Sequence, residues 1–171
     1  MATQRFDGKT ILVTGATGLI GRSLVTGLMD LGATVRTASR GTAPRDWPDH
    51  RRGDLRDPAF VDSISAGIDG LFHLAGIRGA ISRQRAEAAT LLGENLLMDL
   101  LVLRATAEVP RRVYSSTVTV YPSLDGDARE DQAWDDDPHP SAEFVAWSKR
   151  MAEKFIEAQA LQSGHDNTAV L

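Results

Sequence analysis

Three glycines in the segment TGATGLIG, Gly15, Gly18 and Gly21, form the clearest chemical pattern of this sequence. They follow the β-branched run 10–14 and precede apolar residues at helical spacing, so the order is strand, glycine turn and helix. In that order Gly15 permits a tight turn, Gly18 lets the main chain approach a diphosphate, and Gly21 lets the helix pack closely on the strand. We therefore predict a dinucleotide site with phosphate contacts from Gly15, Thr17, Gly18, Leu19, Ile20 and Gly21.

The end of the second expected strand bears on which dinucleotide is bound. A carboxylate there accepts a hydrogen bond from a ribose 2′-hydroxyl, whereas a guanidinium pairs with a 2′-phosphate. The sequence has Ser39 and Arg40 at this place and no acid, which favours NADP over NAD. The alternative is that Arg40 is a solvated surface residue, like the five other arginines between residues 36 and 56. Asp54 is also open to two interpretations, as an adenine-side acceptor or as a turn residue.

Strands that alternate with helices position these residues. The patterns predict strands at 10–14, 33–39, 70–75, 112–120 and 168–171 and helices at 19–31, 57–66, 84–108 and 142–163. A further strand is expected at 50–54 only because the alternation requires one, since HRRGD has low strand propensity. Right-handed crossovers then give one α/β domain over residues 1–171, a doubly wound parallel Rossmann sheet in the order 3-2-1-4-5-6. Such a sheet binds its ligand above the carboxyl ends of the strands.

The last expected helix, 142–163, has a predicted cap and a predicted buried face. Ser141 is of the residue type that caps helix N-termini, and it directly precedes this segment. The apolar residues Met151, Phe155 and Leu161 are expected to face inward.

The composition is that of an ordinary soluble globular domain, with 171 residues, 42% hydrophobic and 25% charged. A net charge of −4 argues against a nucleic-acid-binding protein, and no apolar run is long enough to span a membrane. Because the chain has no cysteine and its start has no signal-peptide pattern, disulfides are excluded and a cytoplasmic location is expected. The four histidines have no metal-ligand spacing, so no metal is expected, and His73 is interpreted as a hydrogen-bonded core residue.

Six motifs occur in order along the chain: TGATGLIG, GDLRD, FHLAG, Asn95 within NLLMDLLVLRA, SSTVTVYP and FVAWSKRMAEKF. With them the sequence resembles the extended short-chain dehydrogenase/reductases, in the NAD-dependent epimerase/dehydratase branch, over nearly all of its length. The resemblance implies an NAD(P)-dependent enzyme that acts on nucleotide sugars or related hydroxylated small molecules. It implies a catalytic group of Thr117, the adjacent Ser116, Lys149 and Asn95, and cofactor contacts from Leu55, Ala75, Gly76 and Lys149.

One position departs from the pattern that this resemblance implies. The family's catalytic tyrosine stands four residues before the lysine, and here that position is Val145. The tyrosine phenolate would take the substrate hydroxyl proton, which valine cannot do. Loss of a general acid/base costs about 10²- to 10⁴-fold in rate, so we expect conventional redox turnover to be impaired. Three interpretations stay open: an engineered replacement that traps a complex, a natural protein that has left redox chemistry, or a different proton transfer by Thr117, Lys149 and a water.

A second departure is the family's C-terminal substrate lobe, which this sequence lacks. The cleft would then be covered by a partner, by the segment 125–137, or by nothing. If that segment does not cover the cleft, its seven acids indicate a solvated connecting loop. Two classes of function are therefore kept: an epimerase, dehydratase or reductase with NADP as hydride carrier, and a non-redox member of the fold. The second class includes an isomerase- or cyclase-type catalyst and a cofactor-binding interaction module. In either class the resemblance implies a homodimer through helices 84–108 and 142–163.

Overall fold

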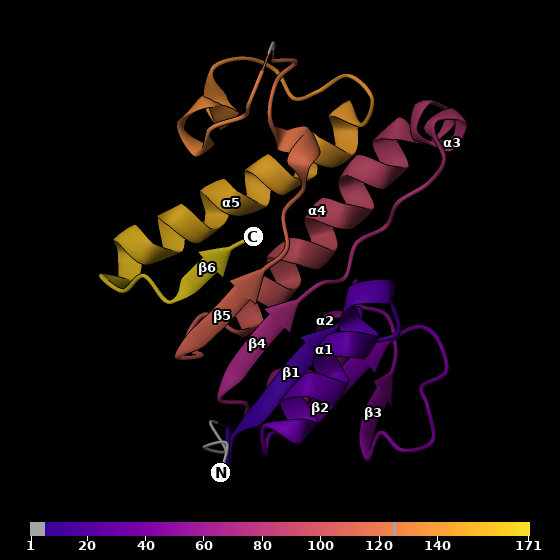
Figure 1. The fold of residues 1–171 in the computed structure, drawn as a ribbon, viewed down its shortest axis with the longest axis vertical. Helices are drawn as coiled ribbons and strands as arrows, with labels where there is room; N and C mark the ends of the chain where they lie inside the picture. The colour runs from indigo at the N-terminus through magenta and orange to yellow at the C-terminus, as the bar shows by residue number, and fades with distance from the viewer. Residues whose placement is uncertain (1–5, 125) are drawn as a thin grey trace.

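A six-stranded parallel sheet forms the centre of the computed structural model, which describes residues 6–124 and 126–171 (Figure 1). Its strands are β1 (Thr10–Thr14), β2 (Thr34–Ser39), β3 (Asp49–Arg52), β4 (Gly70–His73), β5 (Arg111–Tyr114) and β6 (Thr168–Val170). The order is β3-β2-β1-β4-β5-β6, and every adjacent pair is parallel. The predicted α/β fold class and strand order are therefore confirmed.

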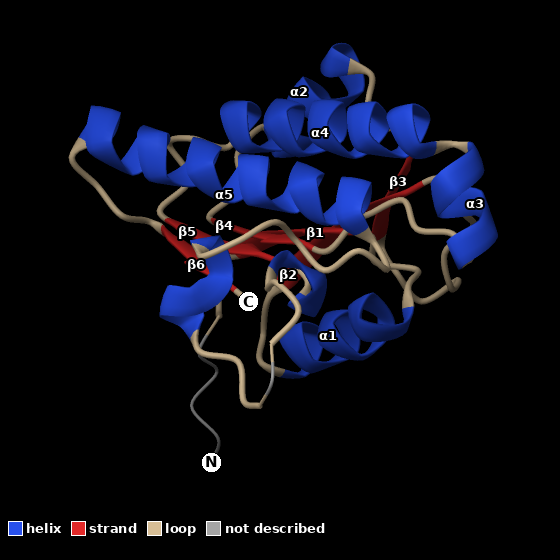
Figure 2. Cartoon of the chain, turned by 90° about the horizontal axis from the view of Figure 1, so that it is seen from above, coloured by secondary structure: helices blue, strands red, loops and turns tan. Residues whose placement is uncertain are grey.

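Helices cover both faces of this sheet. They are α1 (Leu19–Asp30), α2 (Pro58–Ser65), α3 (Ile81–Ala86), α4 (Ala88–Ala105) and α5 (Glu143–Ser163), with short 3₁₀ helices η1 (Val118–Val120) and η2 (Glu130–Trp134). Figure 2 shows α1 on one face and α2, α4 and α5 on the other. None of the helices in the described part of the chain is long and apolar enough to cross a membrane.

The alternation of β1 explains why both faces carry helices. Ile11 and Val13 belong to the hydrophobic cluster under α1, while Leu12 between them belongs to the cluster under α2 and α4. Successive side chains of a strand point to opposite faces, so an unbroken apolar run is what a strand covered on both sides requires. Leu12 and Val13 are fully buried. The local sequence of β1 thus fixes it as a central strand.

The edge strand β3 is held by polar pairs rather than by strand propensity. Arg36 of β2 donates from Nε to Asp49 Oδ2 at 3.0 Å, and Thr37 Oγ1 lies 2.9 Å from His50 Nδ1. These residues are partners in the parallel register. The expected third strand is therefore present, at Asp49–Arg52.

The order and bounds of the elements differ from the sequence predictions at three places. β5 ends at Tyr114 rather than at residue 120, because the chain leaves the sheet and Thr117 caps η1. The expected helix 84–108 is instead two helices, α3 and α4, which meet at Glu87. No helix lies between β2 and β3, which are joined directly by residues 40–48.

The predicted cap and part of the predicted buried face of α5 are wrong. Its N-cap is Ala142 with no side-chain hydrogen bond, because the Ser141 hydroxyl is paired with His139 Nδ1 at 2.8 Å instead. Met151 and Leu161 are exposed, and only Phe155 packs against the core. The helix instead buries Val145 and Ile156 together with small and polar residues, which hydrophobic periodicity does not detect: Ala146, Ser148, Lys149, Arg150 and Ala152.

Two glycines of α1 provide a matched test of how closely this helix approaches the turn after β1. A Cβ on Gly21 would lie 2.5 Å from Gly15 O, whereas a Cβ on Gly27 would meet nothing within 4 Å. We expect Gly21→Ala to destabilise the fold by about 1–3 kcal/mol through overpacking. Gly27→Ala should stabilise it by about 0.5–1 kcal/mol, since alanine loses less entropy in a helix. Urea unfolding measures both, and equal effects of the two changes would contradict the close approach.

Candidate functional site

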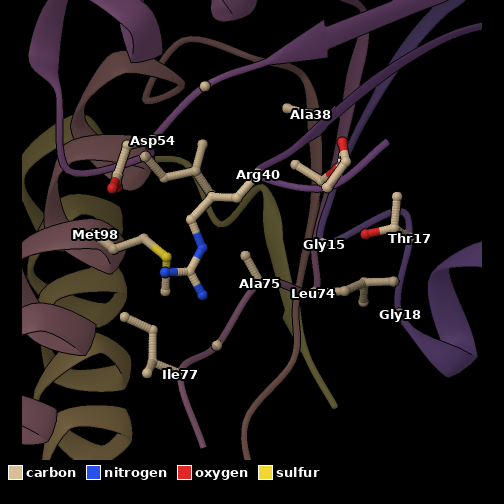
Figure 3. A pocket seen from close by; sticks show the side chains of 15 residues that line it. Gly15, Thr17, Gly18, Ala38, Arg40, Asp54, Leu74, Ala75, Ile77 and Met98 are labelled. Atoms are coloured by element: carbon tan, nitrogen blue, oxygen red, sulfur yellow. Dashed lines mark hydrogen bonds between the residues drawn. The ribbon is translucent and has the colours of Figure 1, made fainter. Parts of the chain in front are cut away.

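A cleft of about 320 Å³ lies where the first four strands end. Its lining comes from the last two residues of β2, from residues that follow β1, β2, β3 and β4, and from one residue of α4 (Figure 3). The lining residues are Gly15, Thr17, Gly18, Ala38, Ser39, Arg40, Gly41, Gly53, Asp54, Leu55, Leu74, Ala75, Gly76, Ile77 and Met98. The sheet therefore places its cleft at the carboxyl edge, as doubly wound sheets do.

The turn after β1 brings bare main chain to the cleft. Gly15 has φ of 67°, a left-handed conformation that favours glycine, and a Cβ there would lie 2.7 Å from the amide nitrogen of Ala75. Gly18 is the N-cap of α1 and supplies no side-chain cap, and the first turn of the helix holds no acid. The first amides of α1 consequently have no intrahelical acceptor and form the positive end of the helix dipole. Such a helix start binds anions, and diphosphates in particular.

Asp54 lies at the opposite side of the cleft in an ion-pair network. Its Oδ1 accepts hydrogen bonds from the backbone N–H and from Nε of Arg56, each at 2.9 Å. The hydrogen bonds from the Arg56 side chain lower the pKa of Asp54 to about 2. Arg56 also pairs with Glu94 of α4. Asp54 is therefore a turn residue that also lines the cleft, so the two interpretations of the sequence are compatible.

Arg40 extends across the cleft from the end of β2. Figure 3 shows its guanidinium among Asp54, Met98, Ala75 and Ile77. The residue is exposed, and its charge contributes to the lowered pKa of Asp54. A cation thus stands at the cleft beside the second strand, at the position from which the sequence predicts contact with a 2′-phosphate.

Eight residues predicted to bind a cofactor line this cleft together: Gly15, Thr17, Gly18, Arg40, Asp54, Leu55, Ala75 and Gly76. Leu19, Ile20, Gly21 and Lys149 do not line it. Leu19 and Ile20 expose their side chains, so only their main-chain amides bear on an anion, and Gly21 is buried behind the turn. The sequence analysis missed Ile77 and Met98, because their places in the lining depend on tertiary packing. The positions of Ala38, Ser39 and Leu74 in the lining could have been inferred, because these residues lie at strand ends.

Lys149 lies in a buried polar cluster next to this cleft. Its Nζ is 3.4 Å from Asp99 Oδ2 and 4.4 Å from the centre of the Tyr114 ring. The Tyr114 hydroxyl donates to the same Oδ2 at 2.6 Å, and His73 Nε2 lies 2.9 Å from Asp99 Oδ1. Only 6% of Lys149 is exposed, and Asp99, Tyr114 and His73 are fully buried. His73 is thus the hydrogen-bonded core histidine that the sequence predicts.

The proposed acid/base residues have clear structural partners. Thr117 Oγ1 lies 3.0 Å from Thr119 Oγ1 at the start of η1, and the Ser116 hydroxyl donates to Glu153 of α5. Asn95 is buried, and its side chain accepts from Ile77 N at 2.8 Å and donates to Ile77 O at 3.0 Å. Asn95 therefore fixes the loop after β4 that forms one wall of the cleft.

Val145 packs against apolar residues at the same wall. It forms a small buried cluster with Ile77, which lines the cleft, and Leu91 of α4. A second cavity of about 290 Å³ begins beside it, lined in part by Gln84 and Phe144. Position 145 thus faces the region between the two cavities, with an apolar side chain that can neither donate nor accept a proton.

Tyr114 cannot serve as a substitute proton carrier. Burial raises the pKa of its phenol, and the negative charge of Asp99 raises it further. The hydroxyl is also committed to Asp99 and fully enclosed. The other tyrosine, Tyr121, is half-buried and lines a separate cavity with His139. Within the described ranges no group of three or more histidine, aspartate or glutamate side chains could hold a metal ion.

Comparison with known protein families assigns the family of this chain. The model of the NAD-dependent epimerase/dehydratase family matches residues 11–170. The chain belongs to this family. Its resemblance to the extended short-chain dehydrogenase/reductases is thereby confirmed.

Proteins that are similar to this chain are named for several different activities. It is 33% identical over 164 residues to a 3β-hydroxysteroid dehydrogenase/Δ5→4-isomerase of Mycobacterium tuberculosis, covering 87% of this chain and 42% of that protein. It is 30% identical over 165 residues to a UDP-glucose 4-epimerase of Neisseria gonorrhoeae, covering 86% of this chain and 47% of that protein. The chain thus spans less than half the length of these relatives.

A solved structure agrees with this assignment. MoeE5 in complex with UDP-glucose and NAD superposes with a TM-score of 0.78 at 30% sequence identity, over 94% of this chain and 52% of that chain. The shared fold is a doubly wound parallel sheet, and the bound NAD is a property of that neighbour.

Proposed function

We propose that this chain binds NADP in the cleft at the carboxyl edge of the sheet. We further propose that it acts on a hydroxylated or nucleotide-sugar-like small molecule. The observation that carries the proposal is the uncapped start of α1, whose first amides have no intrahelical acceptor and follow the turn at Gly15 and Gly18, which lines a cleft of about 320 Å³. A Cβ at Gly15 would collide with the Ala75 backbone, so the turn can form this surface only with glycine.

Particular residues would hold each part of the cofactor. The amides at the start of α1 would bind the diphosphate, and Arg40 would pair with the 2′-phosphate. Asp54, Leu55, Ala75 and Gly76 would enclose the adenosine end. When bound, the nicotinamide supplies hydride transfer, while Thr117 would orient a substrate oxygen and Lys149 would donate to a ribose hydroxyl.

The apolar residue at position 145 supports impaired redox turnover. Val145 is enclosed by Ile77 and Leu91, so no titratable group is supplied from this position of α5. Removing a general acid/base from such a site costs about 10²- to 10⁴-fold in rate. The substrate class is supported by the relatives, whose names include a UDP-glucose 4-epimerase and a hydroxysteroid dehydrogenase.

The alternative is a non-redox member of the fold, either an isomerase- or cyclase-type catalyst or a cofactor-binding interaction module. The packing of Val145 favours it, because the valine belongs to a buried apolar cluster with Ile77 and Leu91. In that case the cleft would hold a dinucleotide without oxidising or reducing a substrate. In either case the absence of cysteine suits the reducing conditions of a cytoplasm, where we expect the protein to act.

Arg40 provides the test of cofactor choice. If its guanidinium pairs with a 2′-phosphate, Arg40→Ser should weaken NADP binding by roughly tenfold to a hundredfold, as expected for a charged hydrogen bond, and leave NAD binding unchanged. Isothermal calorimetry with each nucleotide measures both constants. Arg45→Ser is the matched control, since Arg45 is also exposed but does not line the cleft. Equal weakening by the two variants, or equal loss for NAD and NADP, would contradict the assignment.

Val145→Tyr distinguishes the two classes of function. If only the proton carrier is missing, this change should raise turnover of a hydroxylated substrate by about 10²-fold or more. The reaction is followed by nicotinamide absorbance, with UDP-glucose and a 3β-hydroxysteroid as probes. Val145→Phe supplies the ring without the hydroxyl and should give no gain. NADP binding with no turnover in the tyrosine variant would favour the non-redox alternative.

We also propose a homodimer through α4 and α5, which lie side by side on one face of the sheet (Figure 2). Leu97 of α4 and Met151 of α5 are 47% and 45% exposed, and an isologous contact would bury such side chains. Light scattering at micromolar concentration should give the mass of two chains. The mass of one chain would contradict the dimer.

A further inference from the structure

Asp99 is a fully buried carboxylate on which four secondary-structure elements converge. It lies on α4 and receives His73 from β4, Tyr114 from β5 and Lys149 from α5. His73, Tyr114 and Asp99 have no exposed surface, and Lys149 has almost none. His73 lies within the motif FHLAG and Asp99 within NLLMDLLVLRA, but of these cluster residues the family resemblance gives a role only to Lys149.

The charges of Asp99 and Lys149 depend on each other. A lone carboxylate or ammonium is expensive to bury, so each requires a partner of opposite charge. Burial alone would raise the pKa of Asp99, but the hydrogen bond from His73 and the charge of Lys149 outweigh it, and the pKa lies below its ordinary value. Asp99 is therefore ionised at neutral pH and holds the ammonium of Lys149.

The orientation of the carboxylate is fixed by its other partners. An ionised carboxylate only accepts hydrogen bonds, so His73 Nε2 and the Tyr114 hydroxyl donate to Oδ1 and Oδ2. His73 Nδ1 then accepts from Thr14 Oγ1 at 2.6 Å. Lys149 is confined between this oriented anion and the face of the Tyr114 ring.

The cluster lies directly behind the cofactor cleft. Met98, the neighbour of Asp99 on α4, lines the cleft, and the Ala75 amide at its wall lies 3.4 Å from Thr14 Oγ1. Lys149 makes no hydrogen bond within residues 6–124 and 126–171 beyond its ion pair with Asp99. An ammonium has three N–H donors, so Lys149 retains donors for a ligand hydroxyl.

We infer that Asp99 is the positioning residue for Lys149: it holds the ammonium next to the cleft so that its remaining donors meet a hydroxyl of the bound dinucleotide or substrate. The inference rests on the proposed function only for the identity of that ligand. The ion pair between Asp99 and Lys149 itself is present in the protein without ligand.

The first test needs no cofactor and uses the fact that the chain has only three lysines, Lys9, Lys149 and Lys154. The three lysines are acetylated with an N-hydroxysuccinimide ester, and the acetylation rate of each lysine is measured by mass spectrometry of peptides. Lys9 and Lys154, whose side chains are 55% and 47% exposed, are internal standards. Lys149 should react slowly in the native protein, and Asp99→Asn should accelerate it by roughly tenfold or more, the equivalent of one lost charged hydrogen bond.

Tyr114→Phe is the matched control for this reaction. It removes one hydrogen bond to Asp99 and loosens the same cluster, but keeps the carboxylate and the ring that confine Lys149. Lys149 should therefore stay protected in this variant. Equal acceleration in both variants would mean that general loosening exposes the lysine, and would overturn the inference. If circular dichroism shows that Asp99→Asn does not fold, Asp99→Ser is used in the same comparison.

A double-mutant cycle on NADP affinity tests whether Asp99 acts through Lys149. Asp99→Asn and Lys149→Met should each weaken binding by about tenfold, and the double variant should bind no more weakly than Lys149→Met alone. Additive losses, or native affinity in Asp99→Asn, would overturn the inference. If the native protein binds neither NADP nor NAD, the proposed function fails, while the acetylation rates still decide whether Asp99 holds Lys149.

Discussion

The close approach of two backbone segments, the turn after β1 and the chain after β4, shapes this protein. Gly15 lies so near Ala75 that a side chain on it would overlap the Ala75 amide, and Gly21 brings α1 against the same turn. The turn is closed by hydrogen bonds from Gly15 N to Ala38 O and from Gly18 N to Gly15 O. As a result the N-terminus of α1 lies beside a cleft to which Gly15, Gly18 and Gly76 contribute main chain. The diphosphate site that we propose would thus follow from the packing of β1, α1 and β4.

The buried cluster around Asp99 is the second centre of organisation. It joins β4, β5, α4 and α5 through groups that are polar or charged yet enclosed, and such groups are tolerated in a core only when each has its partners. Through Thr14 and Ala75 the cluster meets the backbone of the cleft wall. The glycine turn and the cluster therefore lie on either side of the same strand ends, one offering amides to an anion and the other holding a cation.

Local patterns were enough to predict the fold and the glycine turn at which we propose diphosphate binding. The β-branched run of β1, the glycines after it and the helical period of α1 are contiguous in sequence, so their arrangement follows from short-range geometry. Lys149 shows the limit of prediction from local patterns. The family resemblance implies that it contacts a cofactor, but its observed partner is Asp99, fifty residues earlier in the chain. No spacing rule connects the two residues. The end of β5 and the break at Glu87 were missed because side-chain contacts, and not the hydrophobic period, set these boundaries. Met98 and Ile77 reach the cleft only through the packing of α4 and of the loop that Asn95 fixes.

The most direct test of the account is the response of the turn amides to ligand. In ¹⁵N–¹H correlation spectra of the labelled protein titrated with NADP, the amides of Gly15, Thr17, Gly18 and Leu19 should show the largest shifts, with Ala75 and Gly76 following. Gly67 and Gly164, which lie in turns outside the cleft, should not move. Saturation of NADP binding with unmoved amides at the start of α1 would contradict the claim that this turn holds the diphosphate.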